Sequence, residues 1–263
     1  MPAATPNRRA VLFGATAAAL SPWSALHAAA TPVGKTRSFA ATNGAAPFVT
    51  EHLIPGDALD LSRVNRSAAS ARVIALTIDD GPDPNDPIIL DILKQHGARA
   101  TFFFIGQKIA EHAKAAAAVA ASGHEVGSHS QTHPMMSDLS AEDQDRNLST
   151  ANHALSAIGV HPTWFRPPFG DFDATTLRLA RAQGMQSVLW TIDSQDWKGT
   201  DADTIANRVV SRLAPGAVIL MHSTKAASVR ALPTILDAGR RRGFRFVTLT
   251  RWREAMAAAG PSR

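Results

Sequence analysis

From residue 72 onward, short apolar runs alternate strictly with stretches whose apolar residues recur at helical spacing. Seven strand–helix units in this order predict a parallel sheet with crossover helices. A distorted (β/α)7 barrel of the TIM type explains seven units better than an open sheet, although the pattern does not exclude the latter. The predicted strands are 73–78, 100–105, 124–128, 163–166, 187–192, 217–221 and 244–249. The predicted helices are 87–96, 107–121, 141–157, 174–183, 203–213, 226–241 and 251–258.

The first 30 residues have the pattern of an export signal. Arg8-Arg9 precedes an apolar run at 10–20, and the alanines at 28–30 suit a signal peptidase. The arginine pair favours the twin-arginine route, with a general secretory signal as the alternative. The run is shorter than the roughly 20 apolar residues that a membrane span needs. We therefore predict an exported protein, periplasmic or secreted, without stable membrane insertion after cleavage. Its parts are a signal at 1–30, a lead-in or linker at 31–70 and a barrel domain at 71–263.

The composition excludes several classes of function. The isoelectric point of 10.2 is high because the chain has neither Tyr nor Cys, so a small basic excess is not balanced until lysine titrates. Beyond residues 1–30, which hold two arginines and no acid, 25 Lys and Arg face 22 Asp and Glu. The basic residues are mostly scattered, so we predict no nucleic-acid binding. The absence of cysteine excludes disulfides, thiolate metal sites and a Cys nucleophile.

Five polar clusters follow the predicted strands. In a parallel α/β barrel, the functional groups gather at the C-terminal ends of the strands, whichever strands they come from. All five clusters should therefore face one mouth, and seven strands would leave that mouth open-sided, as a groove suited to a chain-like substrate. The clusters are Thr77-Ile78-Asp79-Asp80-Gly81, His129-Ser130-Gln131-Thr132-His133, Arg166-Pro167-Pro168-Phe169, Asp193-Ser194-Gln195-Asp196-Trp197 and Leu220-Met221-His222.

Two of these clusters predict a metal site. His129 and His133 are four residues apart, so a short turn would point both imidazoles at one ion, and Pro134 argues against a long helix there. Asp80 would complete a set of two histidines and one carboxylate with positions open for water and substrate. These nitrogen and oxygen ligands favour Zn²⁺, with Co²⁺, Ni²⁺ or Mn²⁺ as alternatives.

The remaining polar residues supply acid–base groups. Two carboxylates at the end of a buried strand need cations, so we assign Asp79 as the base for an attacking water, paired with Arg166. His222 follows an apolar strand and would act as the acid, with Asp196 orienting it and Trp197 excluding water. The two prolines before Phe169 could aim its backbone N–H at an oxyanion, or could simply form a rigid packing loop.

Together, the five clusters resemble the polysaccharide deacetylases, the NodB-homology domain of carbohydrate esterase family 4. The resemblance covers roughly residues 72–250. It includes the phrases Ala100-Thr101-Phe102-Phe103-Phe104-Ile105-Gly106 and Gly123-His124-Glu125-Val126-Gly127-Ser128-His129. The chain departs from the family pattern at Ile78, where Phe is common, and at Phe169, where Tyr is common.

The resemblance implies hydrolysis of N-acetyl groups on a polysaccharide or oligosaccharide, such as peptidoglycan, chitin-like chains or poly-N-acetylglucosamine. The roles that it implies agree with those assigned above: metal ligands Asp80, His129 and His133, base Asp79, acid His222 and oxyanion donor Phe169 N–H. It also implies that Trp197 and Leu220 form the wall of a pocket for the acetyl methyl group. The alternatives are an O-acetyl esterase acting on acetyl-xylan-like polymers, a hydrolase of small amides and a non-catalytic glycan-binding protein. Loss of a ligand or of the acid would mark the last of these, and neither is missing.

Overall fold

The computed structural model describes residues 72–258. The predicted signal at 1–30 and the lead-in at 31–70 lie outside the described residues. Every strand pairing is parallel, and the strand order is β5-β4-β3-β2-β1-β7-β6, with β8 beside the first half of β1. The strands are β1 (Val73–Gly81), β2 (Thr101–Phe104), β3 (Glu125–Ser128), β4 (Trp164–Phe165), β5 (Gln186–Ser187), β6 (Ile192–Asp193), β7 (Val218–His222) and β8 (Arg245–Val247).

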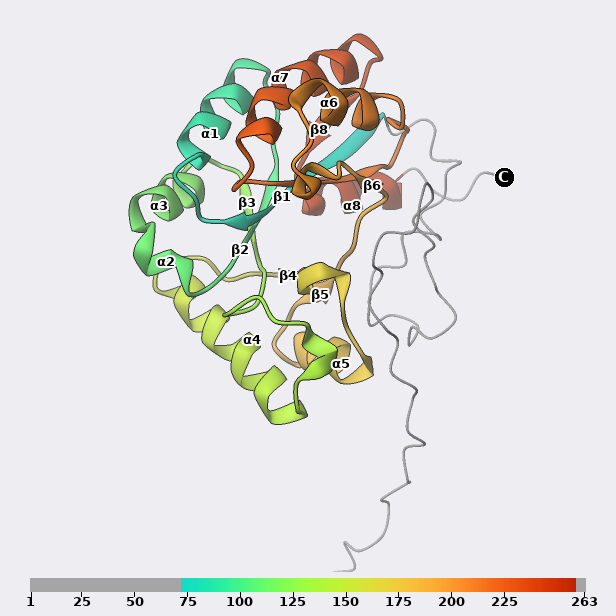
Figure 1. The fold of residues 1–263 in the computed structure, drawn as a ribbon. Helices are drawn as coiled ribbons and strands as arrows, with labels where there is room; N and C mark the ends of the chain where they lie inside the picture. The colour runs from blue at the N-terminus through green and yellow to red at the C-terminus, as the bar shows by residue number, and fades with distance from the viewer. Residues whose placement is uncertain (1–71, 259–263) are drawn as a thin grey trace, which may run out of the picture. The chain divides into compact units, whose positions relative to one another are not determined.

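The sheet curls into an open barrel, as predicted. In the described part of the chain, no pairing joins β5 to β6, so the sheet ends at these two strands. Helices cover the outside of the sheet, with α4 against α5 and α6 against α7 (Figure 1). The helices are α1 (Asp86–Gln95), α2 (Lys108–Glu111), α3 (Ala113–Ala121), α4 (Ala141–Ser156), α5 (Ala174–Ala182), α6 (Ala202–Val210), α7 (Ala226–Arg241) and α8 (Leu249–Ala258), with single 3₁₀ turns η1 (Met136–Asp138), η2 (Pro168–Gly170) and η3 (Asp196–Lys198).

The central strand β1 divides its side chains between two environments. Ile74, Leu76 and Ile78 belong to the large apolar core under the helices, whereas Val73 and Ala75 pack into a second core with Phe103, Trp164 and Val188. This is the two-residue alternation of a strand that is buried on both faces. Continued along β1, the alternation places Thr77 and Asp79 on the barrel-interior side, where the predicted chemistry lies.

The prediction of one strand at 187–192 is wrong. The segment forms two short strands, and the backbone between them leaves the sheet. The side chain of Arg166 donates hydrogen bonds to the two carbonyl oxygens at the start of this break. Its Nη2 lies 2.9 Å from the Leu189 oxygen, and its Nε lies 3.4 Å from the Val188 oxygen. Since these carbonyls are satisfied by a guanidinium, the segment needs no neighbouring strand.

Two smaller expectations also differ. The helix predicted at 107–121 is divided at His112, whose φ of −116° and ψ of 40° are not helical. The pair Asp86-Pro87 predicts an N-cap followed by proline at the first helical position, but Asp86 is itself the first residue of α1, and the N-cap is Asn85. The Asp86 carboxylate instead accepts hydrogen bonds from the Asp83 N–H and the Ser223 hydroxyl, at 2.9 and 2.7 Å, and so connects two loops at the mouth.

Candidate active site

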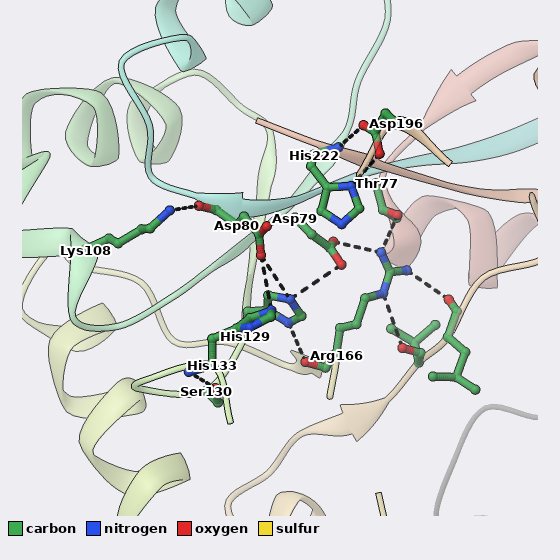
Figure 2. A network of polar contacts seen from close by, with 12 residues as sticks. Thr77, Asp79, Asp80, Lys108, His129, Ser130, His133, Arg166, Asp196 and His222 are labelled. Carbon is green, nitrogen blue, oxygen red and sulfur yellow. Dashed lines mark hydrogen bonds and ion pairs between the residues drawn. The ribbon is translucent and has the colours of Figure 1, made fainter. Parts of the chain in front are cut away.

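The end of β1 carries the two adjacent carboxylates, and β7 runs beside it, with Asp79 paired to His222. Neighbouring residues of a strand normally point to opposite faces. Asp80 is an exception because its backbone is left-handed, with φ of 67°. The turn brings both carboxylates to the same mouth, where histidines from other strand ends also lie (Figure 2).

Asp80, His129 and His133 form one cluster, which we call the ligand cluster. The Oδ1 atom of Asp80 lies 3.6 Å from Nε2 of His129 and 3.3 Å from Nε2 of His133, and the three donor atoms all lie within 4.8 Å of one another. Zinc ligands about 2.1 Å from a tetrahedral ion are about 3.4 Å apart, so the separations fit one ion. Asp80 Oδ1 is buried and has no hydrogen-bond partner among residues 72–258. The cluster is therefore a candidate site for a divalent metal.

The histidines are held so that Nε2 faces this site. Nδ1 of His129 lies 2.7 Å from the Arg166 carbonyl oxygen, and donation of its hydrogen leaves the Nε2 lone pair free for a cation. Burial lowers the pKa of His129 to about 4, despite the opposing charges of Asp79 and Asp80, so the imidazole is neutral at pH 7. His133 is positioned by a bend rather than by a helical turn, because Ser130 and His133 are both left-handed, with φ of 65° and 58°. The Ser130 hydroxyl accepts the His133 backbone N–H at 3.0 Å.

Asp79 is paired with Arg166, as the sequence predicts. Nη1 of Arg166 donates to Asp79 Oδ1 at 2.9 Å, while Asp79 Oδ2 lies 3.7 Å from His129 Nε2, on the side of the ligand cluster. Arg166 is completely buried, and its guanidinium lies over the Phe103 ring at 4.4 Å. Burial lowers the pKa of Arg166, and the charge of Asp79 opposes this change. One oxygen of the carboxylate is thus fixed, and the other faces the mouth.

His222 and Asp196 form a second pair beside Asp79. Nδ1 of His222 lies 2.6 Å from Asp196 Oδ1, and the His222 backbone N–H donates to Asp196 Oδ2 at 2.8 Å. Burial alone would lower the pKa of His222, but the hydrogen bond and charge of Asp196, helped by Asp79 and Asp80, raise it to about 9. The imidazole is therefore protonated at pH 7, and its ring points toward the carboxylates of β1 (Figure 2).

The three predicted substrate-binding residues differ in exposure. Phe169 is 54% exposed, and its ring stands edge-on to that of His133, with the centroids 4.6 Å apart. Its backbone is left-handed, with φ of 58°. Trp197 is 46% exposed, follows Asp196 in η3 and lies 5.1 Å from the Lys198 ammonium. Leu220 is buried in β7. The acetyl pocket and the oxyanion role of the Phe169 N–H remain predictions.

Three residues around the site received no role from the sequence. The Thr77 hydroxyl accepts from Arg166 at 2.5 Å, and a threonine within an apolar strand was a signal for it. Lys108 donates to the Asp80 carbonyl oxygen at 2.8 Å, which supports the left-handed turn. Ser228, in the first turn of α7, donates to Asp196 Oδ2. Lys108 and Ser228 come from helices far along the chain, and no motif marks them.

Fold and site define an open α/β barrel with a candidate metal centre and a histidine–aspartate pair at the C-terminal ends of its strands. Comparison with known proteins gives the family. The family profile described as polysaccharide deacetylase matches residues 66–188. A peptidoglycan-N-acetylglucosamine deacetylase of Bacillus cereus is 38% identical over 67% of this chain and 66% of its own length.

Solved structures give the same result. The Bc1960 peptidoglycan N-acetylglucosamine deacetylase is 36% identical, with a TM-score of 0.68 over 70% of this chain and 89% of its own. BA3943 of Bacillus anthracis, a pseudoenzyme of carbohydrate esterase family 4, is 32% identical, with a TM-score of 0.67 over 70% of this chain and 66% of its own. The chain belongs to the polysaccharide deacetylase family.

Two facts limit what family membership carries over. The chain spans between about two fifths and two thirds of the length of the first curated relatives that it matches. A pseudoenzyme also shares the fold, so similarity in itself does not establish catalysis. The residues of the site must therefore carry the functional argument. Among residues 72–258, no helix has the length and apolar character needed to cross a membrane.

Proposed function

We propose that this protein is a divalent-metal-dependent deacetylase of N-acetylated glycans, with N-acetylglucosamine in peptidoglycan as the first candidate substrate. One observation carries the proposal: the ligand cluster, the Arg166-paired carboxylate of Asp79 and the protonated His222 converge at one mouth. A site with these parts can supply a base and an acid on the two sides of one acyl group. Relatives in the family that are named as deacetylases of peptidoglycan and chitooligosaccharides support the choice of substrate.

The chemistry follows from where each group is held. A divalent cation at the ligand cluster, Zn²⁺ being the first choice, would act as a Lewis acid on the acetyl carbonyl and on the attacking water. Asp79 accepts the proton of that water through Oδ2, while Arg166 holds Oδ1. The water oxygen bonds to the carbonyl carbon, and the Phe169 N–H donates to the oxyanion. His222 then gives its proton to the nitrogen and the C–N bond breaks, which releases the free amine and acetic acid. The acetic acid ionises to acetate, and the proton held by Asp79 returns to His222 through water.

Acetate release tests the proposal across peptidoglycan, chitooligosaccharides, poly-N-acetylglucosamine and acetyl-xylan, with protein loaded with Zn²⁺ or Co²⁺. We expect release from the N-acetylated substrates, loss of release with a chelator, and loss in Asp79→Asn. Metal-loaded protein that is folded and releases no acetate from any substrate would refute the proposal and favour a glycan-binding role.

An O-acetyl esterase is the second candidate, favoured by a similar family 4 carbohydrate esterase of Streptomyces lividans. The acid separates the two reactions, because an alkoxide is a better leaving group than an amine anion and needs less help from a proton donor. His222→Ala should therefore reduce amide hydrolysis more than ester hydrolysis. Ester hydrolysis without amide hydrolysis in the wild type would contradict an N-deacetylase assignment.

The proposed substrates are cell-wall or extracellular polymers, so the function agrees with export through the segment at 1–30. Fractionation of cells that express the full chain tests this, with N-terminal sequencing of the processed protein. We expect a mature protein that begins near residue 31 outside the cytoplasm. Unprocessed protein confined to the cytoplasm would contradict export.

A further inference from the structure

The Asp196 carboxylate is held by more than the imidazole that it orients. Its Oδ1 atom faces His222 Nδ1, and its Oδ2 atom accepts two hydrogen bonds, from the His222 backbone N–H and from the Ser228 hydroxyl. Asp196 is 1% exposed and Ser228 is 3% exposed, so water does not replace these donors. Both oxygens are thereby fixed in direction, and the pKa of Asp196 is held below its usual range, although burial opposes this.

Ser228 does not serve the helix in which it lies. It occupies the first turn of α7, and its backbone N–H donates to the Lys225 carbonyl at 2.9 Å. Serine is a weaker helix former than alanine, and its hydroxyl is most useful at an N-cap position. The N-cap of α7 is Lys225, which makes no side-chain cap bond. The hydroxyl of Ser228 is thus directed at Asp196, next to the positive end of a 16-residue helix, which also favours the carboxylate anion.

This contact fixes the plane of the carboxylate. Without the hydroxyl, Oδ2 would keep only the His222 N–H, and the carboxylate could rotate about its Cβ–Cγ bond. Rotation would turn Oδ1 away from Nδ1, and the imidazole would lose the partner that fixes both its direction and its proton. A small displacement of a catalytic group lowers the rate, because proton transfer needs close alignment with the leaving atom.

We propose that Ser228 is a positioning residue of the deacetylation reaction: its hydroxyl locks the Asp196 carboxylate so that His222 presents its Nε2 proton to the departing nitrogen. The inference rests on the proposed function, since an acid matters only where the leaving group needs a proton. Ser228 touches neither substrate nor metal in this role. Its effect should therefore depend on the leaving group, which a purely structural residue would not produce.

The experiment compares two substrates in three variants. The leaving group of an N-acetylated chitooligosaccharide is an amine, which needs a proton from the acid. The leaving group of 4-nitrophenyl acetate is a stable phenolate, which does not. Ser228→Ala should lower kcat for the glycan about tenfold, with KM unchanged and aryl-ester turnover within about twofold, the size expected for one hydrogen bond to a charged group. Ser228→Thr keeps the hydroxyl and should restore glycan turnover. Ser187→Ala is the matched control, because Ser187 is also buried and its hydroxyl has no hydrogen-bond partner in the described part of the chain.

A second measurement does not depend on turnover. In protein labelled with ¹⁵N-histidine, the Nδ1 proton of His222 should give a downfield NMR resonance, assigned by its absence in His222→Gln. Ser228→Ala should move this resonance upfield, and Ser228→Thr should leave it in place. Thermal unfolding of each variant shows whether the fold is retained.

The outcomes separate the two proposals. Wild-type protein that releases no acetate from glycans would refute the proposed function. The position of the His222 Nδ1 proton resonance in Ser228→Ala would still show whether Ser228 holds the Asp196–His222 pair. Active wild-type protein with equal losses on both substrates in Ser228→Ala, or with no loss and an unmoved resonance, would refute the role of Ser228 alone.

Discussion

The two sides of the mouth are built on different principles. The ligand cluster of Asp80, His129 and His133 gathers three donor atoms without hydrogen bonds between them, and Asp80 and His133 are left-handed. The acid cluster, which we define as His222, Asp196 and Ser228, comes from the end of a strand, a single helical turn and the start of a helix, and every polar atom of the Asp196 carboxylate has a partner. The protein alone satisfies the Asp196 carboxylate, whereas the half-buried Asp80 carboxylate keeps one buried oxygen without a hydrogen-bond partner in residues 72–258, which a divalent cation at the proposed site would satisfy.

Removing a ligand tests this contrast most strongly. His133→Ala should abolish stabilisation by Zn²⁺ or Co²⁺, which in the wild type should reach about 2.7 kcal/mol when the ion is a hundredfold above its Kd. Acetate release should fall at least about a thousandfold, because Lewis-acid catalysis contributes several kcal/mol. Thermal unfolding with and without the ion, and acetate release, measure the two effects.

His153→Ala is the matched control, since His153 is exposed on α4, outside the ligand cluster. It should leave both the stabilisation and the activity unchanged. Ion-dependent stabilisation that persists in His133→Ala would show that the cation binds elsewhere.

Asp79→Asn should separate chemistry from ion binding. The amide cannot take the proton of the attacking water, so kcat should fall by about 10² to 10⁴. Stabilisation by the ion should persist, because Asp80 and the two histidines are untouched. The guanidinium of Arg166 keeps the Thr77 hydroxyl and the Leu189 carbonyl as partners, which favours a folded variant. Circular dichroism checks the fold, and loss of ion-dependent stabilisation in this variant would make Asp79 a ligand rather than the base.

The sequence predicted the contacts of the two carboxylates at the end of β1, whereas their roles stay predictions. The apolar run at 73–78 predicted a buried strand, and the carboxylates after it had to meet cations. The pairing of Asp79 with Arg166 and the proximity of Asp80 to both histidines agree with this reasoning. Strand periodicity alone would have placed Asp80 on the opposite face, and only the left-handed turn removes the conflict.

Local pattern could not predict what depends on long-range contacts. The break in the predicted strand at 187–192 arises because Arg166, more than 20 residues away, binds the carbonyls of Val188 and Leu189. Ser228 looks like an ordinary helix residue until α7 is placed against Asp196. The strand break and the contact of Ser228 become visible only when the elements are packed, because neither is marked by residue spacing or by composition.

Asp196→Asn should change the acid cluster without affecting the ligand cluster. The neutral amide removes the charge that raises the pKa of His222 to about 9, so this pKa should fall toward its ordinary value of 6.5. In the proposed mechanism the protonated imidazole of His222 is the active form, so the alkaline limb of the kcat–pH profile should move from about pH 9 toward neutrality, with a loss of about thirtyfold at pH 8.

Stability should follow the same direction in this variant. A raised folded-state pKa stabilises the wild type fully below about pH 6.5, and this contribution is lost as the pH rises through about 9. Urea unfolding at pH 6 and pH 10 should therefore show a larger difference in the wild type than in Asp196→Asn. An unchanged alkaline limb would remove Asp196 from its role as the partner of the acid.

Phe169→Tyr should have the smallest effect. If the backbone N–H is the oxyanion donor, the side chain can change without altering it, and kcat should stay within about twofold. The side chain is 54% exposed at the mouth, so the added hydroxyl can reach a bound sugar and lower KM for longer oligosaccharides by up to about tenfold, the upper range for one hydrogen bond. Steady-state kinetics on oligomers of increasing length measures both effects. Because the Phe169 ring packs against His133, any change in kcat beyond tenfold would mean that the ring itself sets the geometry of the ligand cluster.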